Sequence, residues 1–511
     1  MNSWCTLLLL ALVSSGTAAL VCSSSDKGYR LTTARGELHG TVSPTFPDVV
    51  VFSGIEYAIQ PVGDLRFRHT SPVRSFPPQA GNYGKACPQS TQALTVDFTP
   101  YVHDEACLYF QFAVPRTALD AGVHVKRAIV TIHGGSFTSG SSVDPSIDFR
   151  RVASLDVVAS FSFNYRLGVL GFVTDGDELN AGFHDQQLAL EVIADVTAAL
   201  GVTRTLLAGQ SAGASSVAAH LLATSQGYDA AFLQSPPAGV RLTTTSEMGV
   251  RWVSMLARSL CFSASCMRKK PVEAVLAYQK DLLAILQLSL FDSRADVFGL
   301  MGLGPVQDGV VFTDNAVRQY NTGAGRHDIP VMVGSLEDEV LFSIRSVLKQ
   351  PIATWMYPLI SSLVVGPSRA HDVRQKYPFL AGEDDTRNPL QRLATDWAFG
   401  CGASSFRGDN VFSYFYIHPS SCSFRGDFCA NQSCHAADLP VFYNSSSRAC
   451  PEITREEMEL GAQWRLRVWG MLEGEEPWAG GTGVEIGGVR DWRPLEYSRD
   501  LHACDYWDQI S

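Results

Sequence analysis

Residues 205–214 read TLLAGQSAGA, an apolar run that meets a G-x-S-x-G pattern centred on Ser211. We interpret this stretch as a strand, a sharp turn and a helix, because apolar residues recur at helical spacing over residues 214–222. Gly209 and Gly213 carry no side chains where strand and helix crowd together, so the turn can lift Ser211 clear of a sheet. The stretch therefore predicts an activated serine nucleophile at the N-terminus of a helix.

The chain around this stretch alternates short β-rich runs with helical segments, which is typical of a mostly parallel sheet covered on both faces. Residues 184–200 repeat apolar side chains on one helical face and end at Gly201, and residues 29–42 predict a small antiparallel hairpin. The Gly-rich residues 473–490 favour a surface loop. We expect one large α/β domain over residues 20–511. The runs read as strands are 108–114, 128–133, 157–164, 231–234, 329–334 and 411–417.

Composition narrows the classes of partner. The 511 residues carry a net charge of -11 and no basic cluster, which argues against nucleic acid or an anionic membrane surface as the main partner. We find no run of about 20 apolar residues, so no transmembrane segment is expected. Neither C-x-x-C nor H-E-x-x-H occurs, and we expect no metal and no cofactor. Small molecules and proteins remain as partners.

The N-terminus and the cysteines indicate the secretory pathway. Residues 1–19 resemble a signal peptide, with an apolar core at residues 7–13 and small residues at 16–19 for cleavage. Removal of Cys5 with this segment leaves eleven of the twelve cysteines, an odd number, and Cys22 is the expected unpaired one. Asn431 and Asn444 lie in N-x-S/T sequons that permit glycosylation. We expect a secreted or lumenal protein.

A serine nucleophile needs a base, an orienting acid and donors for an oxyanion. A loop of two glycines follows the run 128–133, and we expect the backbone N–H groups of Gly135, Ser136 and Ala212 to form the oxyanion hole. The acid should follow the run 329–334, where position alone does not choose among Glu337, Asp338 and Glu339.

Four histidines follow the acid region and could supply the base. Of these, His435 lies beyond the strand 411–417, in the sequence CHAADLP. The four candidates are His371, His418, His435 and His502.

Several further blocks, in the same order along nearly the whole chain, resemble the type-B carboxylesterases, the superfamily that includes the cholinesterases. Residues 52–67 resemble F-x-G-I-P-Y-A followed by P-V-G-x-L-R-F, and residues 105–109 resemble E-D-C-L-Y. Residues 164–172 read NYRLGVLGF, a full match to N-Y-R-L-G-x-L-G-F, and residues 185–190 fit D-Q-x-x-A-L. The resemblance implies an α/β-hydrolase fold.

The same resemblance assigns site residues. It implies that Ser211 is the nucleophile, Glu339 the acid and His435 the base, with one ring nitrogen of His435 near the Ser211 hydroxyl and the other facing Glu339. It also implies that Gly135, Ser136 and Ala212 are the oxyanion donors. Two buried ion pairs, Arg66–Glu105 and Arg166–Asp185, should hold the fold. The implied disulfides are Cys87–Cys107, Cys261–Cys266 and Cys401–Cys504, which leaves Cys22, Cys422, Cys429, Cys434 and Cys450 unassigned.

Two departures from the family pattern bear on specificity. Gln210 precedes the nucleophile where choline-hydrolysing relatives carry a glutamate, and residues 87–107 contain no tryptophan that could face a cation, so choline esters are poor candidates. Ser136 replaces an oxyanion-loop glycine and limits the backbone angles there.

The resemblance favours a secreted serine esterase that acts on neutral carboxylic esters, with a small-molecule or lipid ester as its substrate. A lipase for longer acyl chains would share this chemistry. The competing class is a non-catalytic, cholinesterase-like adhesion or binding protein, and an amidase or peptidase rests only on the shared triad. The sequence leaves the oligomeric state open.

Overall fold

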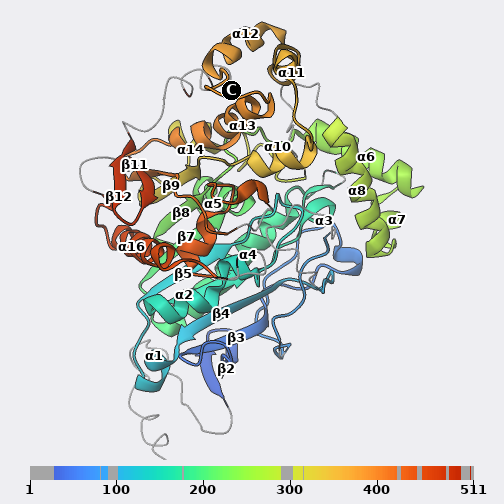
Figure 1. Ribbon diagram of the computed structural model, residues 1–511. Helices are drawn as coiled ribbons and strands as arrows, with labels where there is room; N and C mark the ends of the chain where they lie inside the picture. The colour runs from blue at the N-terminus through green and yellow to red at the C-terminus, as the bar shows by residue number, and fades with distance from the viewer. Residues whose placement is uncertain are drawn as a thin grey trace, which may run out of the picture.

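The computed structural model describes residues 28–80, 82–89, 102–174, 176, 178–288, 303–314, 316–422, 427–445, 450, 452–478, 483–495, 504 and 507. Within these residues one 12-stranded sheet runs through the molecule in the order β1-β2-β3-β4-β6-β5-β7-β8-β9-β10-β11-β12 (Figure 1). The strands are β1 (Tyr29–Thr33), β2 (Gly36–Val42), β3 (Val49–Glu56), β4 (Tyr109–Pro115), β5 (Arg127–Ile132), β6 (Ala159–Phe163), β7 (Arg204–Gln210), β8 (Ala230–Gln234), β9 (Val331–Leu336), β10 (Val411–Tyr416), β11 (Gly483–Gly488) and β12 (Asp491–Pro494).

The sheet has an antiparallel N-terminal part and a parallel centre. Strands β1 to β4 and the β4–β6 pair are antiparallel, whereas β6, β5, β7, β8, β9, β10 and β11 are parallel neighbours. The predicted hairpin and the predicted mostly parallel sheet are confirmed. Part of the Gly-rich segment 473–490 is not the loop that its composition favours: β11 pairs with β10 through residues 483–486, and buried Val484 and Ile486 pack in the core.

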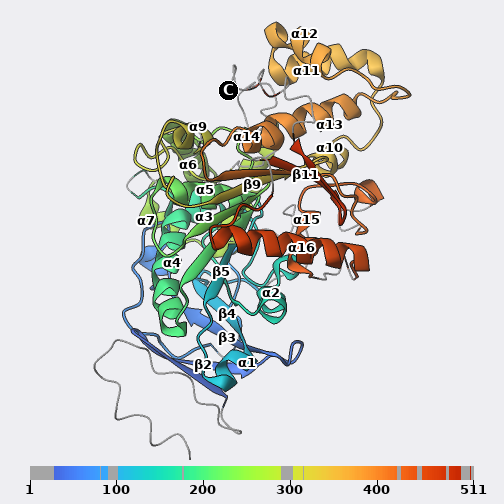
Figure 2. The same ribbon diagram turned by 90° about the vertical axis from the view of Figure 1, so that its left-hand side faces the viewer.

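Helices cover both faces of the sheet. Helices α4 (Ala181–Leu200) and α5 (Ala212–Leu222) lie on one face, and α2 (Phe149–Asp156), α15 (Asp438–Tyr443) and α16 (Arg455–Leu472) lie on the other (Figure 2). The other helices of the described chain are α1 (Arg116–Ala121), α3 (Gly168–Phe172), α6 (Thr245–Ser259), α7 (Ala264–Arg268), α8 (Val272–Leu288), α9 (Ala316–Asn321), α10 (Leu341–Val347), α11 (Tyr357–Val365), α12 (Pro367–Lys376), α13 (Arg387–Thr395) and α14 (Cys401–Ser404).

The alternation of side chains along β7 divides the core into two layers. Leu207 packs in the cluster that holds α4 and α5, whereas Leu206 and Ala208 pack with Trp464 of α16 on the opposite face. All of these side chains are fully buried. Because β7 is covered on both faces, it reads as a continuous apolar run, as central parallel strands do.

This arrangement sets the position of the serine. Strand β7 lies between β5 and β8, so its carboxyl end is flanked by the ends of both neighbours. Strand β9 follows β8 in the sheet and ends at the same edge. Side chains that follow β5, β7 and β9 can therefore meet at the carboxyl edge of the sheet.

Candidate active site

The backbone at Ser211 makes the sharp turn that the sequence predicts, and it is strained. Ser211 has φ 58° and ψ -123° and directly precedes α5. Its N–H donates to the carbonyl of Gln234 at 2.8 Å, which ties the turn to the end of β8. A Cβ atom on Gly209 would lie 2.4 Å from the carbonyl carbon of Gly213, and one on Gly213 would lie 2.1 Å from the carbonyl oxygen of Ile132. Both glycines are required because backbone fills the space a side chain would need.

Of the three neighbouring acids, Glu339 is the one that reaches a histidine. Its Oε2 accepts a hydrogen bond from Nδ1 of His435, and its Oε1 accepts from the N–H of Leu336 at 2.8 Å. Asp338 has other partners, since its carboxylate accepts from the Gln391 amide at 2.5 Å and from the Ser433 N–H at 3.3 Å. Glu339 and His435 are both buried.

The second ring nitrogen of His435 contacts Gln210. With Nδ1 protonated and donating to Glu339, Nε2 is an acceptor, and the side-chain amide of Gln210 lies 3.0 Å from it. Among the described residues, no hydrogen bond joins His435 to the hydroxyl of Ser211. The expected contact with Ser211 is replaced in this structure by a contact with the residue that precedes it.

The loops that carry the acid and the base are bound to each other. Asp338 donates its N–H to the carbonyl of Ser433 at 3.1 Å, and a disulfide joins Cys429 to Cys434, next to the histidine. The ring of Phe399 lies 4.9 Å from the ring of His435. These contacts fix the imidazole relative to the carboxylate, as a general base requires.

The glycine loop after β5 packs against the serine turn. A Cβ atom on Gly134 would lie 2.7 Å from the carbonyl oxygen of Gln210 and 3.2 Å from Cβ of Ser211. Gly135 and Ser136 have φ values of 108° and 54°, so both are in the left-handed region. Gly135 is required there, because a Cβ atom would lie 2.2 Å from the Ser139 carbonyl oxygen. The loop that contains Gly135 and Ser136 is thus packed, through Gly134, against the turn that Ala212 follows.

His133 supports this loop as a neutral side chain. Its ring stacks on Tyr165 at 4.5 Å between centroids, and its Nδ1 lies 2.9 Å from the carbonyl oxygen of Gly134. Burial lowers the pKa of His133 to about 4. The ring is therefore uncharged at neutral pH and acts as a packing group beneath the loop.

Most of the chain matches the model of the carboxylesterase family, over residues 27–469. The chain belongs to the carboxylesterase family. Its likeness to a solved structure named PNB esterase has a TM-score of 0.74 at 21% identity and covers 93% of this chain and 99% of that one. This likeness shows the α/β-hydrolase fold.

Some proteins similar to this chain are named for an enzymatic activity and others are not. The crystal protein of Dictyostelium discoideum is 28% identical over 89% of this chain and 85% of its own length. The phenmedipham hydrolase of Pseudarthrobacter oxydans is 36% identical over 45% of this chain and 47% of its own. The cholinesterase of Mus musculus is 29% identical over 62% of this chain and 54% of its own. Two of these names state a hydrolytic activity and one does not.

A buried polar pair near Glu339 was not expected from the sequence. Asp438 accepts a hydrogen bond from the side-chain amide of Gln234 at 2.8 Å, and both side chains are fully buried. The pKa of Asp438 is raised to about 7, mainly by burial and also by the nearby charge of Glu339, against the lowering effect of the hydrogen bond from Gln234. The sequence does contain a signal for it, because Asp438 lies in the same motif as His435, three residues after the histidine.

Disulfides and ion pairs connect the segments around the site. The structure joins the three pairs that the resemblance implies, and it also joins two pairs that the sequence left open. Arg166 contacts Asp185 at 2.6 Å in the core, and Arg66 pairs with Glu105. The disulfides are Cys87–Cys107, Cys261–Cys266, Cys401–Cys504, Cys422–Cys450 and Cys429–Cys434.

The remaining candidates lie apart from the triad or outside the described residues. His418 contacts the carbonyl of Gly487, and His371 is exposed on α12. Both sequon asparagines are described: Asn431 is exposed and Asn444 is half-buried at the end of α15. The signal segment 1–19, Cys22 and His502 lie outside the described residues.

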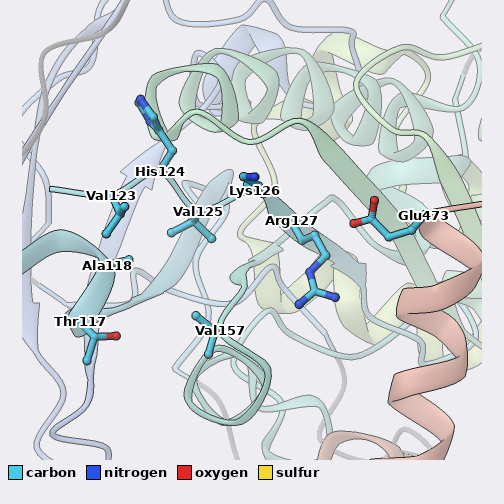
Figure 3. A pocket seen from close by; sticks show the side chains of 9 residues that line it. All are labelled: Thr117, Ala118, Val123, His124, Val125, Lys126, Arg127, Val157 and Glu473. Carbon is cyan, nitrogen blue, oxygen red and sulfur yellow. The ribbon is translucent and has the colours of Figure 1, made fainter. Parts of the chain in front are cut away.

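A pocket of about 590 Å³ lies at the opposite edge of the sheet (Figure 3). It surrounds the amino end of β5, whereas the glycine loop follows the carboxyl end of that strand. The pocket is therefore separate from the candidate active site. Its lining residues are Thr117, Ala118, Val123, His124, Val125, Lys126, Arg127, Val157 and Glu473.

The described residues contain neither a cluster suited to a metal ion nor a helix suited to span a membrane. No group of three or more His, Cys, Asp or Glu side chains in that part of the chain is arranged to hold a metal ion. No helix in it combines the length and the hydrophobicity that crossing a bilayer requires.

Proposed function

We propose that this chain is a serine carboxylic ester hydrolase that acts on neutral carboxylic esters. The observation that carries the proposal is the hydrogen bond between Glu339 and His435, formed at the edge of the sheet where the strained turn presents Ser211. Two segments separated by 96 residues are brought together there. A serine, an acid and an imidazole in this order along the chain, Ser211, Glu339 and His435, match the needs of acyl transfer.

In this mechanism the hydroxyl oxygen of Ser211 attacks the ester carbonyl carbon, and Nε2 of His435 takes the hydroxyl proton. The carbonyl π electrons move to oxygen, and the N–H groups of Gly135, Ser136 and Ala212 stabilise that oxyanion. The C–O bond to the alcohol then breaks, and His435 returns the proton to the leaving alcohol. Water attacks the acyl-serine by the same route and releases the carboxylic acid. Glu339 stabilises the imidazolium in each half of the reaction.

Gln210 has to change partner in this mechanism. In the structure its amide donates to Nε2 of His435, the atom that accepts the serine proton. We infer that the amide moves away when an ester occupies the site. Rotation about the side-chain bonds of one glutamine is sufficient for this change, because His435 is already held by Glu339 through its other nitrogen.

We also propose that the protein is secreted or lumenal. The five disulfides in the described residues support an oxidising compartment, where such bonds persist. The signal-like residues 1–19 and the two sequons support the same route. Whether the acyl chain is short or long, the triad chemistry is unchanged.

A non-catalytic binding protein is the second candidate. One support is the Dictyostelium relative, which is similar over most of this chain and whose name states no activity. The other is the contact between His435 and the amide of Gln210. The presence of serine, acid and histidine together favours the enzyme, because a binding surface does not require that all three be kept.

The deciding experiment compares hydrolysis of p-nitrophenyl butyrate and p-nitrophenyl palmitate by the wild-type protein and by Ser211→Ala. We expect the substitution to reduce kcat by at least about 10⁴-fold, since loss of the nucleophile removes the covalent route. Ser215→Ala, on the same helix one turn later, is the matched control and should keep wild-type activity. Equal turnover by Ser211→Ala would overturn the mechanism, and no turnover of either ester by wild type would favour the binding protein.

A further inference from the structure

Helix α11 presents an apolar surface to solvent. Trp355, in the 3-10 turn that leads into the helix, is 75% exposed, and Leu359 and Leu363 are 55% and 42% exposed. A spacing of four residues places Leu359 and Leu363 on one face of α11, and Trp355 precedes Leu359 by four residues in the turn before the helix. We call Trp355, Leu359 and Leu363 the apolar ridge.

The ridge is not needed to hold the helix in place. The opposite face of α11 buries Tyr357, Ser361 and Val365, and the Tyr357 hydroxyl donates to the carbonyl of Tyr377 at 2.8 Å. That face supplies the packing against the core. Polar side chains could therefore replace the ridge at little cost in folding, so its apolar character calls for another explanation.

The charge around the ridge differs from that of the rest of the molecule. Residues 350–368 contain no Asp, Glu, Lys or Arg. Over residues 349–376, which include α12, four basic side chains stand against Asp372, whereas the whole chain has a net charge of -11. The basic side chains are Lys349, Arg369, Arg374 and Lys376. Arg369, Arg374 and Lys376 lie on α12, which packs against α11, and Lys349 lies in the segment between α10 and α11.

The α11–α12 pair occupies one tip of the molecule. Both views show these helices at the end opposite the N-terminal strands (Figures 1 and 2). A tip can touch a flat surface while the acidic remainder of the protein stays away from it. This matters because like charges repel within roughly a Debye length, about 10 Å, of an anionic surface.

We propose that the α11–α12 tip binds the surface of anionic phospholipid membranes. Tryptophan and leucine side chains insert at the boundary between headgroups and acyl chains, and basic side chains beside them pair with anionic headgroups. A second copy of the chain fits less well, because a symmetric contact through the ridge would bring the two basic α12 helices close together. The proposal does not depend on the proposed ester hydrolysis and is tested by binding alone.

The test is co-sedimentation of the full mature chain with vesicles of phosphatidylcholine alone and with 30% phosphatidylglycerol. At about 50 mM salt we expect at least tenfold tighter binding to the anionic vesicles, and loss of most of it at about 0.5 M salt. The variant Trp355→Gln/Leu359→Gln/Leu363→Gln should weaken the binding at least tenfold. The variant Arg369→Gln/Lys376→Gln should remove the preference for anionic lipid.

The matched control is Leu466→Gln/Met458→Gln on α16, where both side chains are exposed but lie away from the tip. It should bind as wild type does, and circular dichroism should show that every variant is folded. Weak and equal binding to both kinds of vesicle would overturn the proposal, as would unchanged binding by the folded ridge variant. A ridge variant that turns a dimer into a monomer without a change in vesicle binding would instead assign the ridge to self-association.

Discussion

The side-chain amide of Gln210 lies 3.0 Å from Nε2 of His435, the nitrogen that receives the proton of Ser211 in the proposed mechanism. The nucleophile and the group that competes with it for the base are therefore adjacent in the chain. Because an amide is neutral, it holds the imidazole without stabilising the imidazolium as a carboxylate would. The identity of residue 210 should thus affect the pH dependence of the reaction more than the fold.

Gln210→Glu should move the acid limb of kcat/KM for p-nitrophenyl butyrate to higher pH, by about one unit, because a carboxylate beside His435 favours its protonated form. Gln210→Met, which has a similar shape and no charge, is the control and should leave that limb in place. A limb that does not move in the glutamate variant would show that residue 210 does not contact the base in the free enzyme.

Glu339→Gln should reduce kcat by about 10³–10⁴-fold with little change in KM, because an amide cannot stabilise the imidazolium. Glu337→Gln is the matched control, since Glu337 is exposed two residues earlier in the same loop. Steady-state kinetics of both variants checks the assignment. A large loss in Glu337→Gln with none in Glu339→Gln would reverse it.

Local sequence rules were sufficient for the turn at Ser211. The two glycines are required by backbone contacts that the G-x-S-x-G pattern already implies. Position alone could not distinguish among three adjacent acids, and the family motifs indicated Glu339. In the structure the carboxylate of Glu339 accepts a hydrogen bond from His435.

Contacts that depend on three-dimensional packing could not be predicted. No rule of spacing shows that the amide of Gln210 turns toward His435, or that Cys422 pairs with Cys450. Strand β11 was missed because its glycines have a low propensity for strands and favour a loop. Its pairing with β10 stabilises the strand despite this low propensity.

The disulfides should differ in their effect on stability according to the length of chain they close. Cys401 and Cys504 are 103 residues apart, whereas Cys261 and Cys266 are 5 apart. If a disulfide stabilises the protein mainly by restricting the unfolded chain, replacing Cys401 and Cys504 by alanine should lower the free energy of unfolding by about 4–5 kcal/mol. Replacing Cys261 and Cys266 by alanine should lower it by about 2 kcal/mol. Urea unfolding of the two double variants measures this difference. Equal losses would contradict an explanation from chain entropy.

Asp438 should make the folded state less stable as the pH rises. Its folded pKa is raised to about 7 from the ordinary aspartate value of 3.8, chiefly by burial. Between these two pH values the folded protein holds a proton that the unfolded chain has released, so the free energy of unfolding falls with rising pH. The contribution of this group is fully present below about pH 4 and is lost as the pH rises through about 7.

Asp438→Asn should remove this dependence, because an amide can keep the hydrogen bond with Gln234 and has no proton to lose. We expect the difference in Tm between pH 5 and pH 8 to be several degrees smaller in this variant than in wild type. Asp384→Asn, at an exposed position, is the control and should retain the wild-type difference. If the asparagine variant showed the full wild-type change in Tm, another group would have to titrate in this range, and Asp438 would be ionised beside Glu339 at every pH tested.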